Sequence, residues 1–72
     1  MQASHEKITS MGLLSYYNGL TLKERVRFKN YVAQLFELSY FTIDGKFSGR
    51  TRFSAAEVLA LQPVVKSESW KQ

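Results

Sequence analysis

The segment at positions 40–48, YFTIDGKFS, constrains the fold of this chain most strongly, because it fits two incompatible structures. Its Asp-Gly pair, set between alternating apolar and polar residues, is typical of the loop of a β-hairpin. In such a hairpin, directly opposed residues share a face, so Phe41 and Ile43 would lie on one side of the ribbon and Phe47 on the other. A two-stranded ribbon in so small a protein buries only one side. The hairpin would therefore leave large apolar side chains in water.

Wound as a helix, the same segment gathers Tyr40, Ile43 and Phe47 into one compact apolar stripe. Ser39 is a favourable N-cap, and Gly49 can end the helix in the left-handed conformation. The glycine inside the segment costs about 1 kcal/mol relative to alanine, which is less than the cost of leaving an aromatic face in water. The sequence therefore favours a helix here over a hairpin.

Two capping boxes predict where two further helices begin. In each box a hydroxyl side chain precedes a glutamate by three positions: Thr21 stands before Glu24, and Ser54 before Glu57. The hydroxyl can accept a hydrogen bond from the amide of the glutamate, and the carboxylate can accept one from the amide of the hydroxyl residue. We expect the first of these helices to run to about residue 37.

The helix that begins near Leu22 has an apolar face. The residues expected on it are Leu22, Val26, Ala33 and Phe36, with Phe28, Val32 and Leu35 widening it. Two basic residues, Arg25 and Lys29, fall inside the same arc. Either their long side chains snorkel along the surface of the core, or this half of the helix projects past the core and presents its charge to a partner.

Together these elements predict an all-α fold, a small bundle of four or five short helices. A shorter helix over residues 8–17 precedes the two capped helices, and Pro63 is expected to kink or end the last one. The alternative fold is α+β, with a hairpin at 40–49.

A chain of 72 residues provides one small domain with one modest core, and no room for an enzyme cleft of ordinary size. We expect a single helical domain over residues 8–66, flanked by a flexible N-terminus at 1–7 and a polar tail at 67–72. Trp70, the one large apolar residue of that tail, either folds back on the core or hangs free.

The net charge of +4 comes from ten Lys and Arg residues against six Asp and Glu. This balance favours a polyanionic partner, although on count alone a solvated basic surface is the simpler explanation. The chain has no cysteine, no apolar run long enough to span a membrane and no signal-peptide segment. We therefore expect a cytoplasmic protein without disulfides and without a membrane partner.

The run at positions 33–49, AQLFELSYFTIDGKFSG, resembles the helix-turn-helix of phage-repressor-type regulators and of small regulators similar to them in bacteria and phages. Ala33 matches the small residue at which the two helices of that motif touch. Phe36 and Leu38 match the apolar positions before and in the turn. Ile43 and Phe47 match the two buried anchors of the recognition helix.

The resemblance implies a helix-turn-helix at about 22–48, double-stranded DNA as the partner and a role in transcription regulation. The chain departs from the pattern at two places. Glu37 stands where the turn usually has glycine, and Asp44 and Gly45 stand where DNA-facing side chains are expected. A carboxylate at that place is repelled by phosphate, although it can accept a hydrogen bond from cytosine.

In this class of motif the recognition helix enters the major groove by its N-terminal end. Tyr40, Phe41 and Thr42 are therefore the candidates for base contacts, with Phe41 packing on a thymine methyl group. Tyr40 can also be a core aromatic, and Phe41 an exposed residue that docks another protein. The candidates for phosphate contacts are the basic residues Arg27, Lys29, Lys46, Arg50 and Arg52. Specific binding by so small a monomer is expected to need a homodimer that reads two half-sites.

The competing hypothesis is a protein-interaction module without DNA binding, because ten aromatic residues exceed the needs of so small a core. The aromatic residues that could form its surface are Tyr16, Tyr17, Tyr31, Tyr40, Phe41 and Trp70. An enzyme is not expected, since the only histidine, His5, lies in the polar N-terminus and no activated nucleophile or metal-ligand spacing is evident. No cofactor and no small-molecule substrate are implied.

Overall fold

The computed structural model describes residues 9–72, which form four α-helices and a short 3₁₀ turn. The elements are α1 (Ser10–Asn18), α2 (Leu22–Phe36), α3 (Tyr40–Ser48), α4 (Ala55–Ser67) and the 3₁₀ turn η2 (Ser69–Lys71). No strand occurs in these 64 described positions, 9 to 72, so the all-α fold class is confirmed and the alternative hairpin at 40–49 is wrong. The expectations for residues 1–7, for the start of the first helix at Ile8 and for His5 lie outside the described residues.

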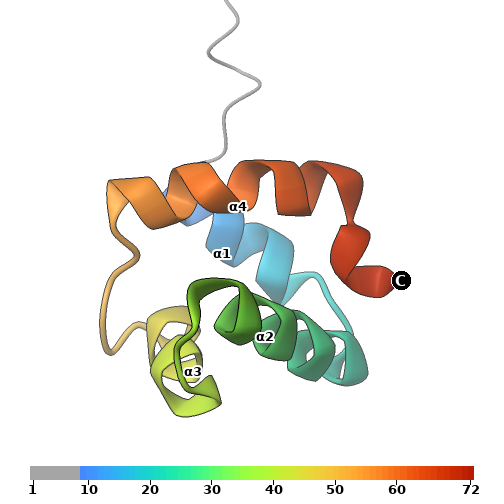
Figure 1. The fold of residues 1–72 in the computed structure, drawn as a ribbon, viewed down its shortest axis with the longest axis horizontal. Helices are drawn as coiled ribbons and strands as arrows, with labels where there is room; N and C mark the ends of the chain where they lie inside the picture. Colours follow the sequence, from blue (N-terminus) through green and yellow to red (C-terminus); the bar gives the residue numbers. More distant parts are fainter. Residues whose placement is uncertain (1–8) are drawn as a thin grey trace, which may run out of the picture.

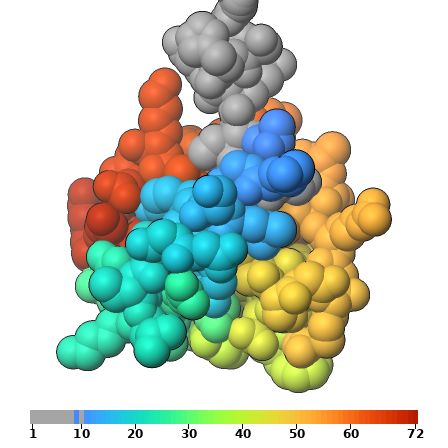
Figure 2. Space-filling view, turned by 180° about the vertical axis from the view of Figure 1, so that it is seen from behind, coloured from blue at the N-terminus to red at the C-terminus, as the bar shows by residue number. Residues whose placement is uncertain are grey.

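The helices are arranged in two levels (Figure 1). α4 crosses the molecule on one level and packs against α1, while α2 and α3 lie on the other level and pack against each other. The turn η2 brings the chain back from the end of α4 to α2. Seen from behind, α1 fills the middle of the surface, between the start of α2 on one side and the loop after α3 on the other (Figure 2).

Both predicted capping boxes are present. In α2, Oγ1 of Thr21 accepts from the amide of Glu24 at 3.1 Å, and the Glu24 carboxylate accepts from the amide of Thr21 at 3.0 Å. In α4, Ser54 and Glu57 make the same two bonds at 3.1 and 2.8 Å. These bonds satisfy amides that the helix itself leaves without partners, so each helix begins where its local sequence predicts.

Pro63 lies inside α4 and does not end it, because the helix continues to Ser67. A proline has no amide hydrogen, so it cannot donate to the carbonyl of Leu59, its partner in a regular helix. Leu59 is 62% exposed, so water can reach the part of the helix that lacks this hydrogen bond. Of the two expectations for Pro63, a kink or an end of the helix, the second is wrong.

The core is built mainly from apolar residues of all four helices. The largest side chains without exposed surface are Phe28, Leu13, Ile43, Leu61 and Val32. In α2 the expected Ala33, Phe28 and Val32 are buried. Leu22 and Val26, also expected on the apolar face, are exposed, so the face is shifted toward Phe28 and Val32. The ring of Phe28 meets the rings of Tyr16, Phe47 and Trp70, at centroid distances of 5.6, 5.6 and 5.1 Å, so α1, α3 and η2 all cover this side of α2.

The C-terminal residues belong to the core. Trp70, in the segment 67–72 that was expected to be a polar tail, is 3% exposed. Its Nε1 donates to the hydroxyl of Tyr16 at 2.9 Å, and that hydroxyl donates to Oε2 of Glu68 at 2.7 Å. Burial, with the bond to Glu68, raises the pKa of Tyr16 to about 12. Of the two alternatives for Trp70, the structure has the one in which it folds back.

Candidate nucleic-acid interface

The turn between α2 and α3 spans three residues and is closed by a Schellman cap. The amide of Leu38 donates to the carbonyl of Ala33 at 2.9 Å, and the amide of Glu37 donates to the carbonyl of Gln34 at 3.2 Å. Glu37 is in the left-handed conformation with φ 58°. The position at which the resembling motif usually has glycine therefore has the backbone conformation that favours glycine, although the residue here is glutamate.

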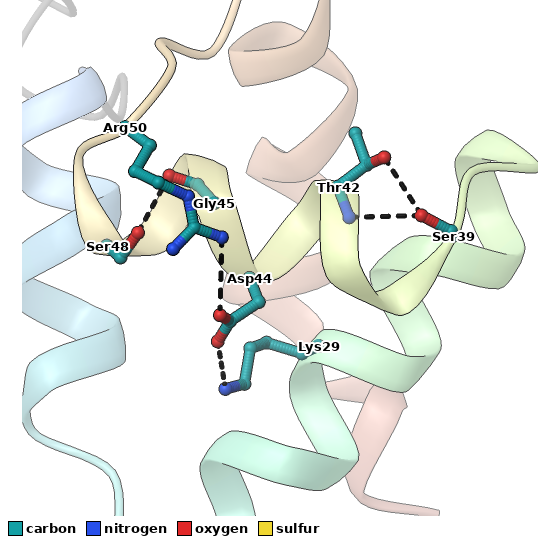
Figure 3. Close-up of polar contacts among 7 residues, drawn as sticks. All are labelled: Lys29, Ser39, Thr42, Asp44, Gly45, Ser48 and Arg50. Carbon is teal, nitrogen blue, oxygen red and sulfur yellow. Dashed lines mark hydrogen bonds and ion pairs between the residues drawn. The ribbon is translucent and has the colours of Figure 1, made fainter.

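α3 is attached to the rest of the fold by Ile43 and Phe47, which are both buried. Its N-terminus is capped by Ser39, whose Oγ accepts from the amide of Thr42 at 3.1 Å (Figure 3). The ring of Phe47 stacks on Tyr17 of α1 at a centroid distance of 4.4 Å. These contacts fix the rotation of α3 about its own axis and hence which residues face outward.

The three candidates for base contacts lie at the exposed N-terminal end of α3. Phe41 is 73% exposed, and Thr42 is also exposed. The Thr42 hydroxyl is hydrogen-bonded to the Ser39 hydroxyl at 2.9 Å. Tyr40 is less accessible, at 36%, because its ring lies beside the ammonium group of Lys29, which is 5.0 Å from the ring centroid.

Lys29 was a candidate for a phosphate contact, but its side chain points inward. Its Nζ donates to Oδ1 of Asp44 at 2.8 Å (Figure 3), and the residue is 8% exposed. Burial, the largest single influence, would lower the pKa of Lys29, but the hydrogen bonds with Asp44, Tyr40 and Tyr17 together outweigh it and raise the pKa. The hydrogen bond from Lys29 also lowers the pKa of Asp44. The structure therefore pairs Lys29 within the protein.

Arg50 approaches α3 from the loop that follows it. Its Nη2 lies 3.8 Å from Oδ2 of Asp44, and its guanidinium carbon is 4.9 Å from the centroid of the Phe41 ring. Figure 3 shows the side chain lying along α3 beside Gly45, with the guanidinium directed toward Asp44. Asp44, the residue expected to repel phosphate, thus has cationic groups on two sides.

The other three basic candidates have different environments. Lys46 is largely buried: its Nζ pairs with Glu57 at 3.2 Å and donates to the carbonyl of Arg52 at 3.2 Å. Arg52 itself is exposed, and its side chain has no hydrogen-bond or ionic partner among residues 9–72. Arg27 donates to the carbonyl of Lys71 at 2.9 Å, so it lies at the C-terminal turn, across the molecule from α3 in Figure 1.

Arg25 decides between the two alternatives for the basic residues in the apolar arc of α2, which were packing along the core or projecting toward a partner. Its guanidinium donates to the carbonyls of Leu20 and Asn18, at 3.2 and 2.8 Å, and so closes the end of α1. Together with Lys29, it shows that this half of α2 turns its charges back toward the fold. Arg50 and Arg52 are therefore the basic candidates that reach solvent near α3.

Sequence reasoning missed the relation between Gly45 and Arg50. Helix propensity counts Gly45 only as a cost, whereas in the structure its missing side chain lets the Arg50 guanidinium lie close against the helix. A signal was present in the sequence: a glycine on the outward side of the predicted helix, followed by a basic residue directly after the capping Gly49. Pairing the two requires the cap geometry, which the sequence alone did not give.

Within residues 9–72, no three His, Cys, Asp or Glu side chains come together in a group that could hold a metal ion. The same part of the chain has no helix with the length and apolar character needed to cross a membrane. Comparison with known proteins gave no family model, no curated protein and no solved structure that matches this chain.

Proposed function

We propose that this protein binds double-stranded DNA through a helix-turn-helix formed by α2 and α3, as a small transcriptional regulator. The observation that carries the proposal is the outward face of α3. No other helix of the described chain, residues 9–72, covers this face. It presents Phe41 and Thr42 at the helix N-terminus, and Arg50 and Arg52 lie next to it. An N-terminal end of this kind suits entry into the major groove.

The charge distribution around α3 supports the proposal. The Asp44 carboxylate would repel phosphate if it stood alone, but Lys29 and Arg50 both lie within ion-pair distance of it. Arg52 has no internal partner among the described residues and is free to contact phosphate. In this proposal Phe41 and Thr42 contact base edges, while Arg52 positions the protein without specifying sequence.

A nine-residue recognition helix contacts only a few base pairs. We therefore propose that two copies act together on a site with two half-sites, spaced by about one turn of DNA, or roughly 34–36 Å. Nuclease protection on a selected site tests this. We expect a protected region with two-fold symmetry that is longer than one copy of the protein can cover.

A second candidate function, a protein-interaction module, has its own supporting observation. Within residues 9–72, eight large apolar side chains are exposed, among them Leu22 at 76% and Met11 at 81%. However, four of the six aromatic residues considered for such a surface lie in or against the core: Tyr16, Tyr17, Tyr31 and Trp70. An interacting surface would therefore rely on the exposed aliphatic residues and on Phe41.

The salt dependence of binding separates the two functions. We expect the affinity for a fluorescently labelled duplex of random sequence to fall steeply as salt rises, because each phosphate contact releases about one counterion. Arg52→Ala should flatten the slope of log affinity against log salt by about one unit. Lys66→Ala is the matched control, because it removes the same charge from an exposed position on α4. It should leave the slope unchanged.

Amide chemical shifts recorded during the same titration should change most at the N-terminal end of α3 and in the loop after it. If the wild-type protein shows no salt-dependent binding to any duplex, the DNA proposal fails. Self-association that persists at high salt, measured by sedimentation, would then favour the interaction module.

A further inference from the structure

Gly45 lies on the outermost side of α3 and is nevertheless buried. With about 100° between successive helical residues, position 45 lies roughly 180° from the midpoint of Ile43 and Phe47. Those two residues face the core, so a residue at 45 should face solvent. Since no other helix in the described part of the chain covers this side, something else must shield the glycine.

The Arg50 side chain provides that shield. A Cβ atom placed on Gly45 would lie 3.2 Å from Nη2 and 3.4 Å from Nε of Arg50. The arrangement follows from the cap of α3: Gly49 is left-handed with φ 94°, and the amide of Arg50 donates to the carbonyl of Gly45 at 2.9 Å. In caps of this type the second residue after the helix commonly packs on the residue five positions before it.

The guanidinium group is held from two directions. The Phe41 ring lies on one side, with the guanidinium carbon 4.9 Å from the ring centroid, and Asp44 lies on the other, 3.8 Å from Nη2. Lys29 in turn holds the Asp44 carboxylate at 2.8 Å. Arg52, two residues further on, has no such support within residues 9–72. The side chain of Arg50 is still half exposed, at 53%, so a ligand can reach it.

We propose that Arg50 is a specificity-determining residue that reads guanine, and is not a phosphate contact. This inference rests on the proposed DNA binding, and it names the base that the site would select. A supported guanidinium on the outermost side of the recognition helix faces the floor of the major groove, where O6 and N7 of guanine accept two parallel hydrogen bonds from arginine. Phosphates lie at the walls of the groove, within reach of the flanking Arg52.

The test is selection of binding sites from a randomised duplex pool, followed by affinity measurements on the selected duplex and on a copy with one guanine replaced by adenine. Wild-type protein should prefer guanine by about tenfold or more. Arg50→Gln should lose this preference or reverse it toward adenine, because glutamine pairs with the adenine edge. The matched control, Arg52→Gln, removes the same charge from the same loop; it should weaken binding to both duplexes alike and keep the preference.

Gly45→Ala is a second variant that leaves every charge in place. Its methyl group would lie 3.2 Å from Nη2 of Arg50, so the guanidinium has to shift by a few tenths of an ångström from its supported position. The preference for guanine should therefore shrink while the salt slope stays at the wild-type value. If Arg50→Gln and Arg52→Gln weaken binding equally and both keep the guanine preference, Arg50 is only a phosphate contact and the inference is overturned, while the proposed function stands. If Gly45→Ala keeps the full preference, the orienting role of this site is overturned. If the wild-type protein binds no duplex, both proposals fail together.

Discussion

The Nζ atom of Lys29 lies 2.8 Å from Oδ1 of Asp44, and this ion pair joins α2 to α3 at the side of the turn. The lysine is buried, whereas the aspartate is partly exposed. Removing one partner therefore has a different cost from removing the other. The aspartate can be hydrated and keeps Arg50 nearby, but the ammonium group would be left in apolar surroundings between aromatic rings.

We expect Asp44→Ala to lower the melting temperature more than Lys29→Met does. The first change leaves a buried ammonium group without its anionic partner, which is costly. The second keeps an unbranched apolar side chain that still packs between Tyr17 and Tyr40. Thermal melts of both variants at neutral pH provide the comparison, and an equal or reversed order would contradict the structural role assigned to this pair.

Stability should fall on acidification. The pKa values of Asp44, Glu57 and Glu68 are lowered in the folded protein, that of Asp44 by its hydrogen bond from Lys29 and that of Glu68 by its hydrogen bond from Tyr16. A group with a lowered pKa stabilises the fold above its unfolded pKa, and this contribution disappears as the pH falls through the folded value. Melting temperatures should hold steady from pH 7 to about 5 and decline below about 4.5, the usual range of these carboxyls. In Asp44→Asn the decline should be shallower.

Glu37→Gly should stabilise the turn between α2 and α3. The glutamate has φ 58°, a conformation that strains a residue with a Cβ atom. Glycine adopts it freely, and the gain in the free energy of unfolding should reach up to about 1 kcal/mol. Glu37→Ala, measured by the same denaturant titration, keeps the strain and removes only the carboxylate. If Glu37→Ala raises the free energy of unfolding as much as Glu37→Gly does, the gain comes from removing the carboxylate and not from relieving backbone strain.

Tyr16→Phe should destabilise the C-terminal turn by about 1–3 kcal/mol, because the buried Nε1 of Trp70 loses its acceptor. The pKa of Tyr16 is raised to about 12, so the wild-type contribution is complete below pH 10 and is lost as the pH rises toward 12. The difference in stability between the two proteins should therefore narrow above pH 10. A constant difference across this range would contradict the assigned hydrogen bonds.

Phe41→Ala should separate binding from stability. The side chain is 73% exposed, so the free energy of unfolding should change by less than about 0.5 kcal/mol. Duplex affinity should drop, because the variant loses a base contact and the ring beside Arg50. Leu59→Ala removes a comparably exposed apolar side chain from α4 and should leave affinity unchanged. Equal losses in the two variants would argue against α3 as the contact surface.

The elements of this fold that could be predicted are those specified by neighbouring residues. The boundaries of α3 follow from Ser39, Gly49 and one apolar stripe, all within eleven positions of each other. The starts of α2 and α4 follow from capping boxes that are equally local. In these segments the local preferences and the tertiary structure agree, so the pattern alone was sufficient.

The features that could not be predicted depend on residues from distant parts of the chain. Phe28 is buried against Trp70, which comes from the other end of the described chain, while Leu22 of the same helix is exposed; no local pattern specifies that contact. The pairing of Lys29 with Asp44 requires the crossing of two helices. For the candidate interface, the sequence indicated the outward position of Phe41 but not the inward direction of Lys29, since a basic residue in an apolar arc has two outcomes that periodicity cannot separate.

The place of Trp70 in the core also has a consequence for the order in which the domain is made. A ribosome synthesises α1 to α4 before it reaches this residue, whose indole ring packs against Phe28 and bonds to Tyr16. The nascent chain therefore carries α1 to α4 while the apolar surface under the indole is still open. We expect such a chain to be prone to aggregation until η2 has emerged.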